Sequence, residues 1–155
     1  MVDGIINFFH LLGTVVWIGG MFYMDLILMP SLAKINPEES GKLMGMIAKK
    51  FTITAWSAII ILITTGILKT PSDMYFDTSD EYGIYLFIKH VLIIGSIIVG
   101  LVITLVYVPG LKATTPKPGE KPSAEFMSYS KKIEHLSKTN LVLGILILIC
   151  ASWLW

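Results

Sequence analysis

The sequence predicts an all-α integral membrane protein, built as a four-helix bundle. Of its 155 residues, 54% are hydrophobic and only 15% are charged, and the mean hydropathy is +0.73. A soluble domain of this length cannot bury so much apolar surface. Four apolar runs are long enough to cross the hydrocarbon core, and each must be helical because lipid offers an open backbone no hydrogen-bond partner.

The four predicted spans cover about residues 4–30, 51–68, 83–108 and 136–155. The fourth run is short, so we expect it to continue a longer helix that starts near Ser123. Between the first two spans, Pro37-Glu38-Glu39 is a typical helix start, and the apolar residues after it have helical spacing. We expect a short amphipathic cytoplasmic helix over residues 37–50, on the membrane surface or continuous with the second span.

The other two connections differ in composition. Residues 69–82, KTPSDMYFDTSDEY, are acidic and rich in turn residues. Residues 109–125 contain four of the seven prolines, which predicts a flexible, extended linker. No internal repeat is visible, and we expect the whole chain, residues 1–155, to form a single transmembrane domain.

The lysines predict the orientation, because cytoplasmic connections carry an excess of positive charge. All twelve basic residues are lysines; four lie in the first connection, six in the third, and only Lys69 in the acidic second one. We therefore expect the first and third connections in the cytoplasm, both termini outside, and the cell (plasma) membrane as the location. Aromatic residues near the predicted outer surface agree: Tyr82, Tyr85, Trp153 and Trp155.

Two histidines lie inside predicted spans at matching depth. His10 is six residues inside the first span and His90 is seven residues inside the third, both counted from the outer end. At about 1.5 Å per residue, both lie roughly 10 Å below the outer edge, where imidazoles of two helices can face each other. Such a pair is typical of the ligands of haem b or a transition metal. The alternative is that each histidine only bridges two helices by a hydrogen bond.

One face of the first span carries further candidates. Five of its residues fall within about 40° of one line along the helix: His10, Trp17, Met21, Met24 and Leu28. Trp17 is a candidate cofactor contact, and Met21 and Met24 are candidate metal ligands because their soft sulfur atoms suit Cu(I). The alternative is a packing stripe, because methionine fills gaps between helices well.

Three more ionisable residues require a role. Lys89 either reaches the lipid headgroups or faces inward and holds an acidic group such as a haem propionate. Asp25, near the inner end of the first span, either pairs with a lysine such as Lys49 or reaches water. His135 lies among charges at the inner interface, and we expect it to be solvated; a ligand role would place it in a second, inner site.

Composition also excludes several classes of protein. The net charge of +1 and the lack of arginine argue against a nucleic-acid partner. The one cysteine, Cys150, can form neither an intramolecular disulfide nor a multi-cysteine zinc site. No phosphate loop, dinucleotide fingerprint or paired nucleophile and base is present, so enzymatic activity stays open and would come from a bound cofactor. The expected partners are the lipid bilayer, subunits of a membrane complex, or further copies of the chain.

Several segments together resemble a known family. HLLGTVVWIGGMFYMDLILMPSL, residues 10–32, resembles the first helix of the CopD-like (copper resistance protein D) membrane domain, where a histidine precedes a tryptophan, a glycine pair and a proline. Here these residues are His10, Trp17, Gly19-Gly20 and Pro30. KKFTITAWSAIIILITTGIL and YGIYLFIKHVLIIGSIIVGL are similar to the next two helices of that family, the latter with Lys89 near its start. The resemblance implies a role in copper uptake or resistance.

A second resemblance is to the membrane protoporphyrinogen oxidase of the HemJ type, a small four-helix protein that binds haem b. His10, the run MFYM and Lys89 match its pattern, but Asp25 stands where that family has an arginine. We predict a CopD-like membrane protein in copper or redox homeostasis, with haem b or copper bound between spans one and three. The alternatives are a HemJ-like haem-dependent oxidase and a non-catalytic subunit of a larger membrane complex.

Overall fold

The structure, a computed structural model, describes residues 2–117 and 120–154. The described part of the chain is helical apart from short connections, and it contains no strand. In chain order its segments are α1 (Val2–Tyr23), the π-helical η1 (Met24–Leu28), α2 (Met29–Leu32), α3 (Pro37–Lys69), the 3-10 turn η2 (Ser72–Met74), α4 (Glu81–Val102), the π-helical η3 (Ile103–Tyr107), α5 (Val108–Ala113) and α6 (Ala124–Ser152).

Four continuous helical stretches of the described chain are long and apolar enough to cross a membrane, which confirms the predicted fold class. They cover Val2–Leu32, Glu38–Lys69, Glu81–Ala113 and Ala124–Ser152. Each is longer than the corresponding predicted span, because helices continue beyond the apolar run into polar sequence. Trp155, assigned to the fourth span and to the outer aromatic belt, lies outside the described residues.

Side-chain caps explain where three of these helices begin. Asn36 accepts a hydrogen bond from the Glu38 amide at 2.9 Å, and Asp80 accepts one from the Gly83 amide at 2.7 Å. Ser123 caps α6 by accepting from the Phe126 amide at 3.1 Å. Each cap satisfies an amide that has no partner inside its helix. The long fourth helix predicted to start near Ser123 is therefore confirmed.

One connection agrees with the prediction and one differs. Residues 37–50 are helical and continue into the second span as the first part of α3, which is one of the two arrangements we expected. Residues 109–113 are helical in α5, although we expected an extended linker from Pro109 onward. Pro109 directly follows the π-helical η3, whose wider turn accommodates the proline ring, so the helix continues through it. Residues 118 and 119 of the same linker lie outside the described part.

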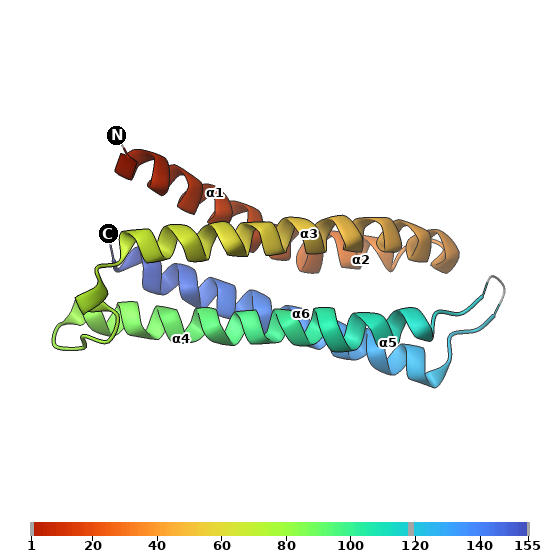
Figure 1. Ribbon diagram of the computed structural model, residues 1–155. Helices are drawn as coiled ribbons and strands as arrows, with labels where there is room; N and C mark the ends of the chain where they lie inside the picture. The colour runs from red at the N-terminus through yellow and green to blue at the C-terminus, as the bar shows by residue number, and fades with distance from the viewer. Residues whose placement is uncertain (1, 118–119, 155) are drawn as a thin grey trace.

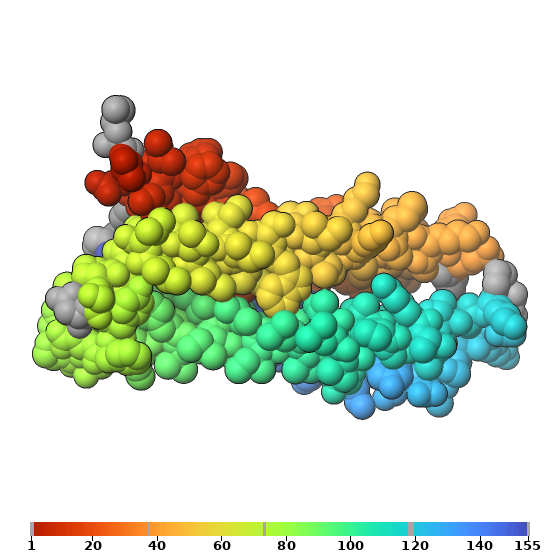
Figure 2. Space-filling view, in the orientation of Figure 1, coloured from red at the N-terminus to blue at the C-terminus, as the bar shows by residue number. Residues whose placement is uncertain are grey.

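The helices form two hairpins, α1 with α3 and α4 with α6, and α6 also contacts α1 (Figure 1). The start of α1, the end of α6 and the 70–80 connection lie together at one end of the bundle (Figure 1). We call this the terminal end, and the opposite end, with connections 33–36 and 114–123, the lysine-rich end. In the space-filling view, α3 lies between the first turns of α1 and the helix α4 (Figure 2).

The core lies where α1, α3 and α6 meet, and it is mainly apolar. Its central cluster is Trp17, Ile18, Met21, Ala58, Ile59, Leu141 and Ile147. Two polar contacts cross the bundle beside it. Ser96 of α4, which is 1% exposed, donates to the Asn140 side chain of α6, and the Trp56 indole donates to Thr104 at 3.4 Å. Buried hydrogen bonds of this kind hold helices together where apolar attraction contributes little.

The first and third spans share a structural plan that the sequence did not reveal. Each contains a five-residue π-helical segment, η1 or η3, that ends two residues before a proline, Pro30 or Pro109. A proline ring clashes with the carbonyl four residues earlier in an α-helix, and a wider turn relieves that clash. Since both spans run from the terminal end to the lysine-rich end, the two hairpins are built alike (Figure 1).

We expect Gly13→Leu to lower the free energy of unfolding by about 1–3 kcal/mol, as overpacking does. A Cβ at Gly13 would lie 3.0 Å from Leu62 Cγ and 3.3 Å from the Ala58 carbonyl oxygen of α3. Gly19→Leu on the same helix is the matched control, because a Cβ there meets nothing within 4 Å. Reversible unfolding in detergent measures both, and an equal loss for the two variants would contradict close packing at Gly13.

We expect the terminal end to face outward. Both variants carry Cys150→Ala, so that the introduced cysteine is the one thiol. A membrane-impermeant thiol reagent added to intact cells should label Asp77→Cys and leave Lys121→Cys unlabelled. In inside-out vesicles, the reagent should label Lys121→Cys and leave Asp77→Cys unlabelled. The reason is the excess of lysines at the opposite end, in and around the first and third connections. Labelling of Asp77→Cys from the cytoplasmic side alone would invert the orientation.

Candidate functional site

His10 lies on the half-buried face of α1, and its ring is held by α3. His10 Nδ1 is 2.8 Å from Thr65 Oγ1, and Gly66 lies against the ring. Thr65 Oγ1 donates its one hydrogen to the Ile61 carbonyl at 2.7 Å, so it accepts a hydrogen from His10 Nδ1. The hydrogen on Nδ1 leaves Nε2 of the neutral ring with a free lone pair. This tautomer and this second hydrogen bond are typical of histidines that bind a metal.

The residue that orients His10 comes from a helix that the sequence did not indicate. Thr14, one turn away on α1, donates instead to the backbone carbonyl of His10 at 2.8 Å. Thr65 lies 55 residues further along the chain and is buried, 7% exposed. The only sequence signal was a polar residue late in an apolar span.

His90 lies on α4 near the same end of the bundle. Its Nδ1 is buried and makes no well-formed hydrogen bond among the described residues, although the Leu86 carbonyl, one turn earlier on α4, lies near enough to act on the ring. The His90 ring lies against Tyr75, with 5.7 Å between ring centroids. The Tyr75 hydroxyl donates to the Ile67 carbonyl at the end of α3, at 3.4 Å. A buried polar atom without a partner is uncommon, and it marks a position where a ligand can bind.

The two histidines lie on either side of the end of α3. His10 contacts Thr65 and Gly66, whereas His90 contacts Tyr75, which is bonded to Ile67. Within the described chain, the two rings make no contact with each other. The structure therefore places both at the terminal end, as the depth argument predicted, and puts the last turns of α3 between their helices.

Lys89 is half-buried, and its positive charge acts on both imidazoles. The charge of Lys69, at the end of α3, also acts on His10. The terminal end therefore has positive charge beside the two imidazole rings. That field favours a ligand with an anionic part or a low positive charge.

Trp17, Met21 and Met24 lie deeper in the bundle than His10. They are about 10, 16 and 21 Å further along the helix axis, from the rise of an α-helix. Trp17 and Met21 are 5% exposed in the central core, where Met21 faces Gly144 of α6, and Met24 packs with Leu28 and Leu32. The predicted stripe on α1 is thus a buried face, and it does not bring these residues to the histidines.

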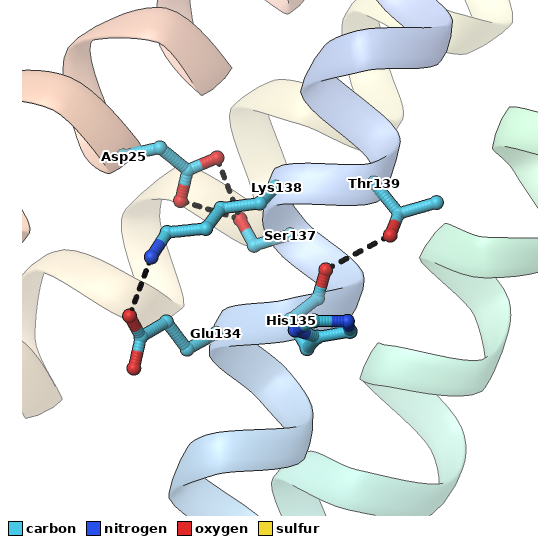
Figure 3. Close-up of polar contacts among 6 residues, drawn as sticks. All are labelled: Asp25, Glu134, His135, Ser137, Lys138 and Thr139. Atoms are coloured by element: carbon cyan, nitrogen blue, oxygen red, sulfur yellow. Dashed lines mark hydrogen bonds and ion pairs between the residues drawn. The ribbon is translucent and has the colours of Figure 1, made fainter.

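Asp25 has a partner that we did not expect. The carboxylate is 8% exposed and accepts from Ser137 Oγ of α6 at 2.7 and 2.9 Å (Figure 3). We expected a lysine such as Lys49 or water at this position, and burial between two helices overturns both. His135 is exposed on α6, as expected. In the described residues, no three or more His, Cys, Asp or Glu side chains form a group that could hold a metal.

Comparison with known proteins agrees with the first of the two resemblances. The sequence model of the family described as Copper resistance protein D matches residues 45–154, more than two thirds of the chain. The match begins after the first span and covers most of α3 and all of α4 and α6. No curated protein and no solved structure matches significantly.

We expect His10 to carry its hydrogen on Nδ1, because the Thr65 hydroxyl is already a donor to Ile61. Nitrogen chemical shifts of ¹⁵N-histidine protein in lipid report the tautomer. Thr65→Val should release the ring, whereas Thr65→Ser should preserve the Nδ1–H form. An Nε2–H tautomer in the unmodified protein would contradict the assignment.

Proposed function

Because the chain belongs to the copper resistance protein D family, we propose that it binds a copper ion at the terminal end through His10 and His90. It is a multi-pass membrane protein related to copper resistance, with four apolar helices that contact lipid. The copper site and its residues are the part that we propose.

The availability of one ring nitrogen on each histidine carries this proposal. The hydrogen bond to Thr65 leaves His10 Nε2 free, and the buried His90 Nδ1 makes no well-formed hydrogen bond in the described chain. Imidazole is a good copper ligand. The last turns of α3 separate the two rings, so one ion held by both would require the end of α3 to move out from between α1 and α4.

The charges around the site favour the lower oxidation state of copper. Lys89 acts on both rings, and a cation of charge +1 is repelled less by it than one of charge +2. Met21 and Met24 lie about 16 and 21 Å further along α1 and pack in the apolar core, so they are too far from His10 to share its ion.

Haem b is the second candidate, and Lys89 is the observation that favours it. When bound, haem would supply redox chemistry, its iron held by His10 and His90 and an acidic propionate held by Lys89. The same lysine that repels a doubly charged metal would stabilise that propionate. A HemJ-like oxidase would need this haem, whereas a subunit that only packs in a complex would need neither ligand.

We expect His10→Ala and His90→Ala each to lose bound copper by at least tenfold, while the variants still insert in the membrane. Thr65→Val, which removes the hydrogen-bond partner of His10, should weaken copper binding about 10–100-fold, the usual effect of losing such a hydrogen bond. His135→Ala is the matched control, because that ring is exposed at the other end.

Metal analysis and an absorption spectrum of the purified protein separate the candidates. Copper without a Soret band supports the copper site, and a Soret band lost in both variants supports haem b. Full copper retention in both alanine variants, or neither ligand in the purified protein after copper loading, overturns the histidine site.

A further inference from the structure

Asp25 is a buried carboxylate in the first span that the histidine site does not use. It lies in η1, where α1 meets α6, toward the lysine-rich end. Both of its oxygens contact the same hydroxyl, Ser137 Oγ, at 2.7 and 2.9 Å (Figure 3). Ionisable groups inside a membrane span are costly and commonly mark the path of an ion or a proton. π-Helical segments also occur frequently at functional sites.

Few hydrogen-bond donors of the described chain reach the Asp25 carboxylate. A hydroxyl has one hydrogen, whereas an ionised carboxylate can accept about four hydrogen bonds. Within the described chain, no lysine or histidine nitrogen lies within 4.0 Å of the Asp25 oxygens. A proton on Asp25 would remove the buried charge and donate to Ser137 Oγ, whose own hydrogen could then turn to another acceptor.

A cation lies close by but is held by a different acid. Lys138 follows Ser137 on α6, and its side chain extends past Asp25 to Glu134, with Nζ 2.6 Å from Glu134 Oε1 (Figure 3). This pair is exposed, with 57% and 53% of the two side chains accessible. The charges of Lys138 and Glu134 both act on Asp25. The two acids therefore compete for one ammonium group.

The other elements around Asp25 add no further charge to this competition. The part of α3 that packs on η1 presents apolar side chains, Met44, Ile47 and Phe51. On α6, His135 points away from Asp25 (Figure 3). Lys138 and Glu134 are thus the charged groups that can respond to a change at Asp25.

We propose that Asp25 is a proton-binding residue at the lysine-rich end of the bundle, and that Lys138 exchanges between Glu134 and Asp25. With the proton bound, Asp25 is neutral and Lys138 pairs with Glu134. When the proton leaves to water, Asp25 carries one negative charge, the Lys138 ammonium moves to it, and water hydrates the exposed Glu134. This site is independent of the copper proposal and gives the protein a place to exchange protons near the membrane surface.

The competing explanation is a purely structural hydrogen bond that ties α1 to α6. Asp25→Asn separates the two, because the asparagine oxygen still accepts from Ser137 but cannot gain or lose a proton. Glu134→Gln is the second variant: it frees Lys138 for Asp25 and leaves the Asp25–Ser137 contact intact. Glu38→Gln is its matched control, since Glu38 forms an equivalent exposed pair with Lys42 at 2.7 Å.

The test is infrared titration of the full-length protein in lipid nanodiscs, followed at the carbonyl stretch of protonated carboxylic acids. We expect a band in the unmodified protein that titrates with pH and is absent in Asp25→Asn. In Glu134→Gln its midpoint should move by roughly one pH unit toward lower pH, because Lys138 then stabilises the charged Asp25. Glu38→Gln should leave the midpoint unchanged.

Two results would overturn the proposal. One is an unchanged band in a folded Asp25→Asn variant, as judged by circular dichroism and elution volume. The other is a Glu134→Gln midpoint equal to that of the Glu38→Gln control. If Asp25→Asn does not fold, the Glu134→Gln comparison decides alone, because that residue is exposed and outside the packed core.

Discussion

Backbone hydrogen bonding in lipid is the constraint on which the rest of this structure depends. Since the hydrocarbon core offers no partners, each span satisfies its amides and carbonyls within its own helix. Polar side chains inside the spans must then find partners on neighbouring helices. His10 with Thr65 joins the two helices of the first hairpin, and Ser96 with Asn140 joins those of the second. Asp25 with Ser137 ties one hairpin to the other.

The two ends of the bundle carry different polar groups, each held by one of these contacts. At the terminal end, the Thr65 hydroxyl sets which nitrogen of His10 is free, and the last turns of α3 lie between His10 and His90. At the lysine-rich end, one serine holds a buried carboxylate beside an exposed ion pair. The apolar core with Trp17 and Met21 lies between the two ends.

The prolines show how local chemistry shapes the spans. Pro30 and Pro109 would each break α-helical hydrogen bonding in lipid, where a lost bond is costly. The chain responds with a π-helical turn before each one, and the first of these turns carries Asp25. The wider turn thus places the one buried acid of the first span at its contact with α6.

The sequence by itself determined the four helices, the cap at Ser123 and the buried face of α1, because hydropathy, capping chemistry and helical period are local properties. It also placed His10 and His90 at one end through their depth. Only the tertiary structure decided their partners. Thr65 lies 55 residues from His10, and Ser137 lies 112 residues from Asp25. The rotation and pairing of packed helices depend on contacts such as Gly13 with Ala58, which leave no periodic signal in the sequence.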